Sequence, residues 1–273
     1  YLALSYVWGG ATQLQLTSEN FTSLSTENGL NELSDSIPRT IKDAMILCKN
    51  LGERYLWVDT LCIVQDDESD RHFQISNMAN IYSQAVLTIV AASGSSADAG
   101  LPGHISSING TELISTRHDI VPLIENSPWY SRGWTLQEYV LSHRLLFFVG
   151  GEAVYCCRTT MWREDSMPQE LLSWNGEIEL RERLGLLSHF SGTTDGFKHY
   201  TELVNTYITS DLSNDNYILN AISGALENIH SVGKSFQGLP EATLDLGLLW
   251  QTEDRTPPER REGFPSWSWA GWK

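Results

Sequence analysis

The stretch that decides the fold is Val-Leu-Thr-Ile-Val-Ala-Ala at residues 86–92. It is short, almost wholly apolar and rich in β-branched side chains, which favours an extended strand. It does not show the polar–apolar alternation of a strand with one face in water. A continuous apolar run is typical of a strand that is covered on both faces, as in a parallel sheet between helices. We therefore expect residues 86–92 to form a strand of an α/β sheet that is covered on both faces.

Outward from this strand, strand and helix patterns alternate along the first 160 residues. Helical spacing of apolar residues predicts a helix that Ser36-Ile37-Pro38 opens and Gly52 ends, and a second helix from Phe73 to Tyr82. A third helix is expected to start at Ser127-Pro128 and to end near Ser142, although Gly133 could break its first part. Such alternation is the signature of a parallel sheet with right-handed crossovers. The further strands are predicted at residues 2–8, 55–59 with a loose continuation to 64, 144–149 and 153–157.

The remaining segments are less regular. Residues 11–36 indicate a hairpin or a long loop, and residues 93–126 indicate a long loop. After residue 160 the pattern turns helical, and the Trp/Ser alternation over residues 264–272 predicts a closing strand with one buried face. We therefore predict a domain over residues 1–160 and a mostly helical extension over residues 161–273. Helical or apolar elements of the extension are expected at residues 171–187, 200–207, 215–229 and 244–250.

Composition and charge exclude several classes of function. The chain has 34 acidic and 18 basic residues and a net charge of −16, the opposite sign from a nucleic-acid-binding protein. It contains no apolar run of about 18 residues, so no membrane span is predicted. Four cysteines without metal-ligand spacing favour reduced thiols in a cytoplasmic protein. The acidic run at residues 66–70 lacks the glycine and closing glutamate of a calcium loop, so we expect a solvated turn and no metal.

Candidate binding residues follow the predicted strands. Ligands of open parallel sheets bind at the carboxyl ends of the strands. Ser5, Tyr6, Trp8 and Gly9 lie at this end of the first strand, and Asp59 lies at this end of the second. Gly9 and the glycine after it would let a phosphate approach backbone N–H groups, while Asp59 could bind a ribose or orient Arg132. The alternatives are core packing for Trp8 and a turn or helix N-cap role for Asp59.

A second candidate site lies in the third predicted helix. Trp134 and Glu138 are four residues apart and are therefore neighbours on one helix face. A carboxylate that a helix holds beside an aromatic ring suits ribose or nucleotide chemistry. The alternative is that Trp134 belongs to the core and that Glu138 forms an ion pair with Arg132 or Arg144. His72, His143 and His199 have no nearby nucleophile at motif spacing, so Ser/His/Asp and Cys/His catalysis are unsupported.

Three spaced blocks of this sequence occur together and in order. They are LALSYVWG at residues 2–9, the segment from Ile37-Pro38-Arg39 through LWVDTLCIVQ at 56–65 to MANIY at 78–82, and RGWTLQE at 132–138. Together they resemble the heterokaryon incompatibility (HET) domain of filamentous fungi, and PSWSWAGW at residues 265–272 is similar to the end of full-length proteins of this type. The blocks cover roughly the first 150 residues, and ordered blocks are more specific than one short motif.

The resemblance implies a flavodoxin-like sheet similar to that of TIR domains, which are distant relatives of HET domains. It implies a role in regulated fungal cell death and innate immunity. The Trp134–Glu138 spacing resembles that of a tryptophan and a glutamate in a TIR helix, and in enzymatic TIR domains that glutamate supports cleavage of NAD at its nicotinamide–ribose bond. The resemblance therefore implies Glu138 as the catalytic residue and Trp134 as a substrate-binding residue, with NAD as a substrate and no cofactor. Apart from the resemblance, we also expect Arg132 to be a substrate-binding residue.

A single carboxylate is chemically sufficient for this reaction. Nicotinamide departs neutral from a cationic pyridinium, so no general acid is needed, and Glu138 could offset the positive charge that develops on the ribose. Self-association would activate such an enzyme, and its partner would be an upstream receptor or an allelic incompatibility protein. The alternative is a non-enzymatic death-signalling module that acts through protein–protein binding.

Overall fold

The structure, a computed structural model, describes most of the chain in two compact units. The described residues are 1–101, 106–108, 111–113, 119–157, 160–164, 193–229, 233–252 and 259–273. The first unit comprises residues 1–131 and 142–186, and the second comprises residues 132–141 and 187–273. The helix predicted at residues 171–187 lies outside the described residues, and the predicted domain boundary at residue 160 stays a prediction.

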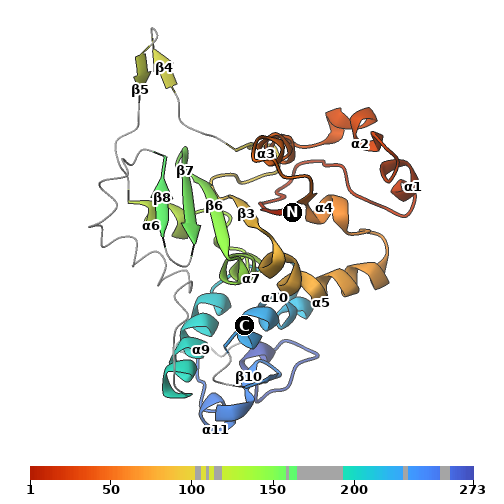
Figure 1. The fold of residues 1–273 in the computed structure, drawn as a ribbon. Helices are drawn as coiled ribbons and strands as arrows, with labels where there is room; N and C mark the ends of the chain where they lie inside the picture. The colour runs from red at the N-terminus through yellow and green to blue at the C-terminus, as the bar shows by residue number, and fades with distance from the viewer. Residues whose placement is uncertain are drawn as a thin grey trace. The chain divides into compact units, whose positions relative to one another are not determined.

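The first unit is built on a six-stranded sheet with the order β2-β1-β3-β6-β7-β8 (Figure 1). The first four strands in this order are parallel, and β7 and β8 are antiparallel to their neighbours. The α/β class predicted from the alternation of strands and helices is therefore confirmed. The strands are β1 Leu2–Ser5, β2 Leu56–Trp57, β3 Leu87–Ala91, β6 Arg144–Val149, β7 Glu152–Cys157 and β8 Met161–Arg163.

Strand β3 is an interior strand of this sheet, and it is covered on both faces as its apolar run predicts. It pairs with β1 on one side and with β6 on the other. Ile89 and Val90 point to opposite faces, and both side chains are fully buried. The buried hydroxyl of Thr88 is hydrogen-bonded to that of Ser142 at 2.7 Å, which satisfies the polar atoms in this apolar layer.

The sheet stops being parallel at the turn between β6 and β7. Gly150 and Gly151 have φ of 59° and 82°. Two consecutive positive φ angles form the two-residue turn that fits the twist of a hairpin, so the chain reverses here and makes no helical crossover. The hairpin continues into β8, where buried Arg163 donates to Glu152 at 2.5 Å.

The helices of the first unit match the predictions in part. Helix α3 (Arg39–Asn50) begins after Pro38 and packs on β1 and β2. Just after its C-terminal end, the N–H of Glu53 donates a hydrogen bond to the carbonyl of Cys48. Helix α5 (Glu68–Gln84) includes the predicted helix, and Asp67 of the acidic run caps it by accepting from two backbone N–H groups. The other elements are α1 Phe21–Leu24, α2 Gly29–Glu32, the 3₁₀ turn η1 Ser34–Ser36, α4 Asp59–Cys62, β4 Ser106–Ile108, β5 Thr111–Leu113 and α6 Ile120–Glu125.

One local prediction for the first 142 residues was wrong, and two were confirmed in part. The second strand does not continue to residue 64, because the N–H groups of Leu61 and Cys62 turn back to the carbonyl of Val58 and form α4. Residues 11–36 form the long loop of the two alternatives, with short helical turns and no strand. The third predicted helix begins only after Gly133, the possible break, since α7 spans Thr135–Leu141 and turns precede it.

The second unit is mostly helical (Figure 1). Helix α7 packs on α10 (Asn220–Glu227), and α9 spans Thr193–Ile208, which includes the predicted helix at 200–207. The predicted helix at 215–229 is divided into η3 (Asp215–Tyr217) and α10. The remaining elements are β9 Ser235–Phe236, β10 Leu239–Pro240, η5 Glu241–Thr243, α11 Leu244–Gly247 and η6 Trp269–Gly271.

The closing tryptophan segment is not the predicted strand. The Ser268 hydroxyl accepts from the N–H of Ala270 and starts a 3₁₀ turn. Trp269 is 7% exposed and Trp267 is 40% exposed. The Trp/Ser alternation, which predicts a strand with one buried face, therefore belongs to a turn in which the two indoles are buried to different extents. None of the described helices is long and apolar enough to cross a membrane.

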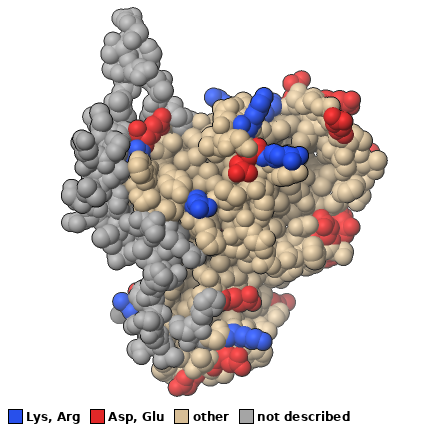
Figure 2. Space-filling model, viewed as in Figure 1, with Lys and Arg blue, Asp and Glu red and all other residues tan. Residues whose placement is uncertain are grey.

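Charged side chains are scattered over the surface. On the face shown in Figure 2, the lysine and arginine side chains of the described residues stand singly or beside acidic ones. They form no continuous basic patch on this face, in keeping with the excess of acidic residues in the chain.

Candidate functional site

The candidate residue Ser5 ends β1 and is 1% exposed. Its hydroxyl accepts a hydrogen bond of 2.6 Å from Nε1 of Trp129, which is fully buried. The indole of Trp129 also packs edge-on against Phe147 of β6, with ring centroids 5.8 Å apart. A buried indole N–H needs an acceptor, and in this apolar layer Ser5 provides it.

Tyr6 follows Ser5 and is also buried. Its hydroxyl lies 3.0 Å from the Thr60 hydroxyl and donates to Oε1 of Gln13 at 3.2 Å. A phenol has one hydrogen, so Thr60 donates to Tyr6 when Tyr6 donates to Gln13. Tyr6 therefore connects the end of β1 to helix α4 and to the loop after β1.

Trp8 and Asp59 are brought together, as their predicted place at the strand ends requires. Nε1 of Trp8 donates to Oδ2 of Asp59 at 2.8 Å, and Oδ1 of Asp59 accepts from the N–H of Thr60 at 2.7 Å. Asp59 lies in the first turn of α4, where a carboxylate is favoured by the helix dipole. These contacts correspond to the turn interpretation of Asp59, and ribose binding by Asp59 stays a prediction.

Gly9 is held against the loop that follows β3. Its φ is 61°, and a Cβ there would lie 2.5 Å from the carbonyl oxygen of Ser95 and 2.8 Å from Cα of Ser96. The N–H of Ala97 donates to the carbonyl of Trp8 at 3.1 Å. The glycine therefore allows two loops of the same chain to approach each other. Phosphate binding at Gly9 stays a prediction.

The thiol nearest these residues is not activated. Cys62 lies in α4, and its sulfur accepts from the N–H of Val58. Burial raises the pKa of the Cys62 thiol, so the protonated form dominates at neutral pH. The described residues contain no group of histidine, cysteine and carboxylate side chains that could hold a metal ion.

The other candidate residues belong to the second unit, where a tight loop leads into α7. The carbonyl of Arg132 accepts from the N–H and the hydroxyl of Thr135. The N–H of Gly133 donates to the carbonyl of Asp211 at 2.9 Å, and a Cβ on Gly133 would lie 2.8 Å from Leu212. The Arg-Gly-Trp-Thr sequence thus fixes the start of α7 against the segment that follows α9.

Glu138 is 6% exposed, and all seven residues of α7 are buried. Trp134 is half-buried, and its ring packs at a tilt against Tyr217 with centroids 6.1 Å apart. Neither Glu138 nor Arg132 is without an interaction partner. Beside Glu138, Gln137 is 1% exposed and its Nε2 atom has no hydrogen-bond partner. Helix α7 therefore combines a buried carboxylate with a buried donor that is not used.

The structure groups the predicted residues in two sets. Ser5, Tyr6, Trp8, Gly9 and Asp59 belong to the first unit, and Arg132, Trp134 and Glu138 belong to the second. Sequence reasoning missed three residues of these sets: Trp129, Thr60 and Gln137. The isolated serine in an apolar strand was the available signal for a buried polar partner such as Trp129.

Comparison with known proteins agrees with the blocks quoted above. Residues 1–138 match the family model described as "Heterokaryon incompatibility protein (HET)". A segment of the chain is 35% identical over 100 residues to heterokaryon incompatibility protein 6, OR allele, of Neurospora crassa. That match covers 33% of this chain and 14% of the relative's length. No solved structure matches the chain. Since the family model covers half of the sequence, the chain belongs to the heterokaryon incompatibility family.

Proposed function

We propose that this chain is a cell-death effector domain of fungal heterokaryon incompatibility. The family match over residues 1–138 carries this proposal, because it extends from β1 to Glu138 in α7. The Neurospora relative that matches a third of the chain is itself an incompatibility protein by name. The effector would act in the cytoplasm, and four free cysteines fit a reducing compartment.

The test of this role is induced expression of the chain in a filamentous fungus, with death scored by a vital dye. Wild type is expected to kill. The control is Ile89→Asp, which places a charge in a fully buried position of β3 and should abolish both folding and killing. Survival of cells that accumulate the folded wild-type chain, with its upstream partner present, contradicts the proposal.

Within this role, we propose that Glu138 supports hydrolysis of NAD to nicotinamide and ADP-ribose. The strand order β2-β1-β3-β6 supports a flavodoxin-like sheet, the class to which nucleotide-binding folds belong. Glu138 is 6% exposed, and a carboxylate shielded from water interacts more strongly with a developing positive charge. Burial fits a core ion pair equally well, so the variants below decide between the two. In this reaction the nicotinamide–ribose bond breaks with its electron pair going to nicotinamide. Water adds to the ribose carbon and releases a proton.

The test is nicotinamide release by concentrated protein, compared between wild type, Glu138→Gln and Glu138→Ala. Removal of one group that stabilises a transition-state charge lowers turnover by about 100-fold to 1,000-fold. Glu227→Gln is the matched control, because Glu227 is an exposed carboxylate of α10 in the same unit. A turnover that rises faster than protein concentration supports activation by self-association. Wild-type turnover that Glu138→Gln leaves unchanged contradicts the proposal.

The second candidate is a non-enzymatic module that signals by binding a receptor or an allelic partner. One observation favours it: the hydroxyls of Ser5 and Tyr6 and the carboxylate of Asp59 are all used in bonds within the chain. Equal killing by wild type and Glu138→Gln, with cellular NAD unchanged in both, supports this candidate. Killing that is lost with Glu138→Gln and tracks NAD depletion supports the enzyme.

A further inference from the structure

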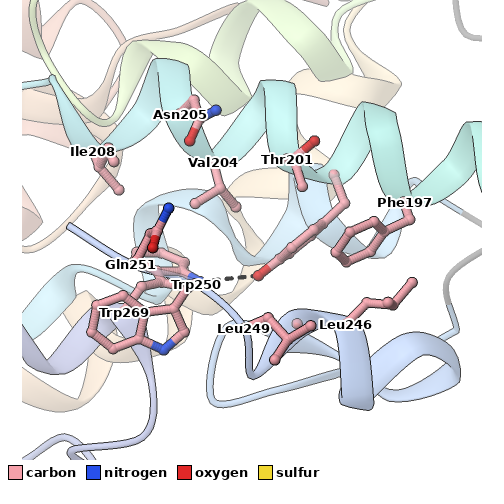
Figure 3. A pocket seen from close by; sticks show the side chains of 12 residues that line it. Phe197, Thr201, Val204, Asn205, Ile208, Leu246, Leu249, Trp250, Gln251 and Trp269 are labelled. Atoms are coloured by element: carbon pink, nitrogen blue, oxygen red, sulfur yellow. Dashed lines mark hydrogen bonds between the residues drawn. The ribbon is translucent and has the colours of Figure 1, made fainter. Parts of the chain in front are cut away.

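The second unit contains a pocket of about 390 Å³ between α9 and the segment that includes α11. Figure 3 shows Val204 and Ile208 of α9 on one wall and Leu246 and Leu249 on the opposite wall, with the indole of Trp269 at one end. The volume is within the range of about 300–1,000 Å³ of small-molecule sites. No residue predicted from the sequence as a binding residue lines it, so it is a site distinct from α7.

The inner surface of this pocket is fixed by a hydrogen-bonded aromatic pair. Nε1 of Trp269 donates to the Tyr200 hydroxyl at 3.1 Å, the bond drawn in Figure 3, and that hydroxyl donates to the carbonyl of Gly238 at 2.9 Å. Phe197 stacks on Tyr200, with ring centroids 5.7 Å apart. Burial raises the pKa of Tyr200 to about 12, so its phenol stays neutral at physiological pH. The wall is therefore preformed, aromatic and uncharged.

The polar groups of the pocket indicate the class of ligand. Among the described residues that line it, none is acidic, basic or a histidine. The exposed amides of Asn205 and Gln251 lie at its border and can each donate and accept a hydrogen bond. A charged ligand would lose its hydration here without gaining an opposite charge, whereas a neutral apolar one would gain from burial.

We propose that this pocket binds a neutral, mainly apolar small molecule that carries one or two hydrogen-bonding groups. Leu249 would gain most from a bound ligand, because it lines the pocket and its apolar side chain is 74% exposed to water. Its neighbour Leu248 is also exposed, at 45%, but does not line the pocket. These two leucines therefore separate binding in the pocket from adhesion to an apolar surface.

The experiment compares two fluorescent probes that share an anilinonaphthalene body. N-phenyl-1-naphthylamine is neutral, and 8-anilinonaphthalene-1-sulfonate carries an anionic group. Both are titrated into the whole chain at about 0.15 M salt, where long-range repulsion by the acidic protein is screened. The neutral probe is expected to bind with one molecule per chain and about tenfold more tightly than the anion. Leu249→Glu should lower the affinity for the neutral probe about tenfold or more, because one leucine contact with the probe is lost. Leu248→Glu should leave this affinity unchanged.

Four outcomes would overturn the proposal. They are no binding of the neutral probe, binding of several probe molecules per chain, equal affinity for the anion, and equal weakening by Leu248→Glu and Leu249→Glu. Light scattering on wild type and Leu249→Glu adds a fifth, because an oligomer that dissociates only in Leu249→Glu means that a second copy occupies the pocket. Leu249 is exposed, so loss of folding does not account for its effect.

Discussion

Replacing Gln137 by methionine should stabilise the protein, although Gln137 lies beside Glu138 in the most characteristic motif of the chain. Gln137 is 1% exposed, and its Nε2 atom has no hydrogen-bond partner. A buried donor without a partner costs about 1–3 kcal/mol, because it loses water and gains nothing in return. Methionine has a similar length and helix propensity, so it removes the donor with little change in packing.

We therefore expect Gln137→Met to raise the free energy of unfolding by about 1–3 kcal/mol. Urea denaturation followed by circular dichroism measures this change. The control is Gln84→Met, since Gln84 is an exposed glutamine at the end of α5 and its replacement should stay within about 0.5 kcal/mol. A loss of 1 kcal/mol or more in Gln137→Met would refute the reasoning, because it would mean that the amide already has a partner in the folded protein.

The same variant bears on function. A residue that costs stability and is nevertheless present is expected where a ligand uses it. If Gln137→Met is more stable and also loses NAD turnover, the amide is a binding group of the Glu138 site. If it is more stable and retains full killing in cells, the unused donor has no role in either candidate function.

Two further predictions concern the ends of β1 and β3. Gly9→Ala should destabilise the protein by about 1–3 kcal/mol, since its positive φ and the 2.5 Å approach to a loop carbonyl leave no room for a Cβ. Gly10→Ala, where a Cβ would meet nothing within 4 Å, should cost far less in the same urea titration. Ser5→Ala should cost about 1–3 kcal/mol by leaving the Trp129 indole without an acceptor, and an unchanged urea midpoint would contradict this.

The sheet could be predicted from the sequence because its signal is local. Residues 86–92 are apolar without alternation, and only a strand that is covered on both faces places such a run at no cost. Helix α3 was equally readable, because Pro38 and Gly52 mark its ends. The continuation of the second strand failed for a local reason too. The apolar run after Asp59 resembles a strand, but the Asp59 carboxylate binds the N–H of Thr60 and starts a helical turn.

The site was less predictable, because its geometry depends on contacts that are distant in the sequence. Trp129 and Ser5 are 124 residues apart, and the sequence around neither residue indicates that they form a hydrogen bond. Gly9 and its loop partner Ser95 are similarly distant, so the two consecutive glycines gave no sign of the second loop that Gly9 approaches. The closing Trp/Ser segment shows the same limit, since alternation alone does not distinguish a strand from a turn whose indoles pack separately.

The polar side chains of the two units differ in how they are used, and this difference determines which substitutions test the proposed function. In the first unit, Ser5, Tyr6 and Asp59 complete hydrogen bonds that hold the strand ends and their loops together. Removing any of them should therefore lower stability before it lowers activity. In α7, Gln137 has a buried donor without a hydrogen-bond partner, and the following residue, Glu138, is also buried. Glu138 is also the residue for which the enzyme and the non-enzymatic module predict different outcomes. Substitutions of Glu138 and Gln137 therefore decide between them, and substitutions at the end of β1 do not.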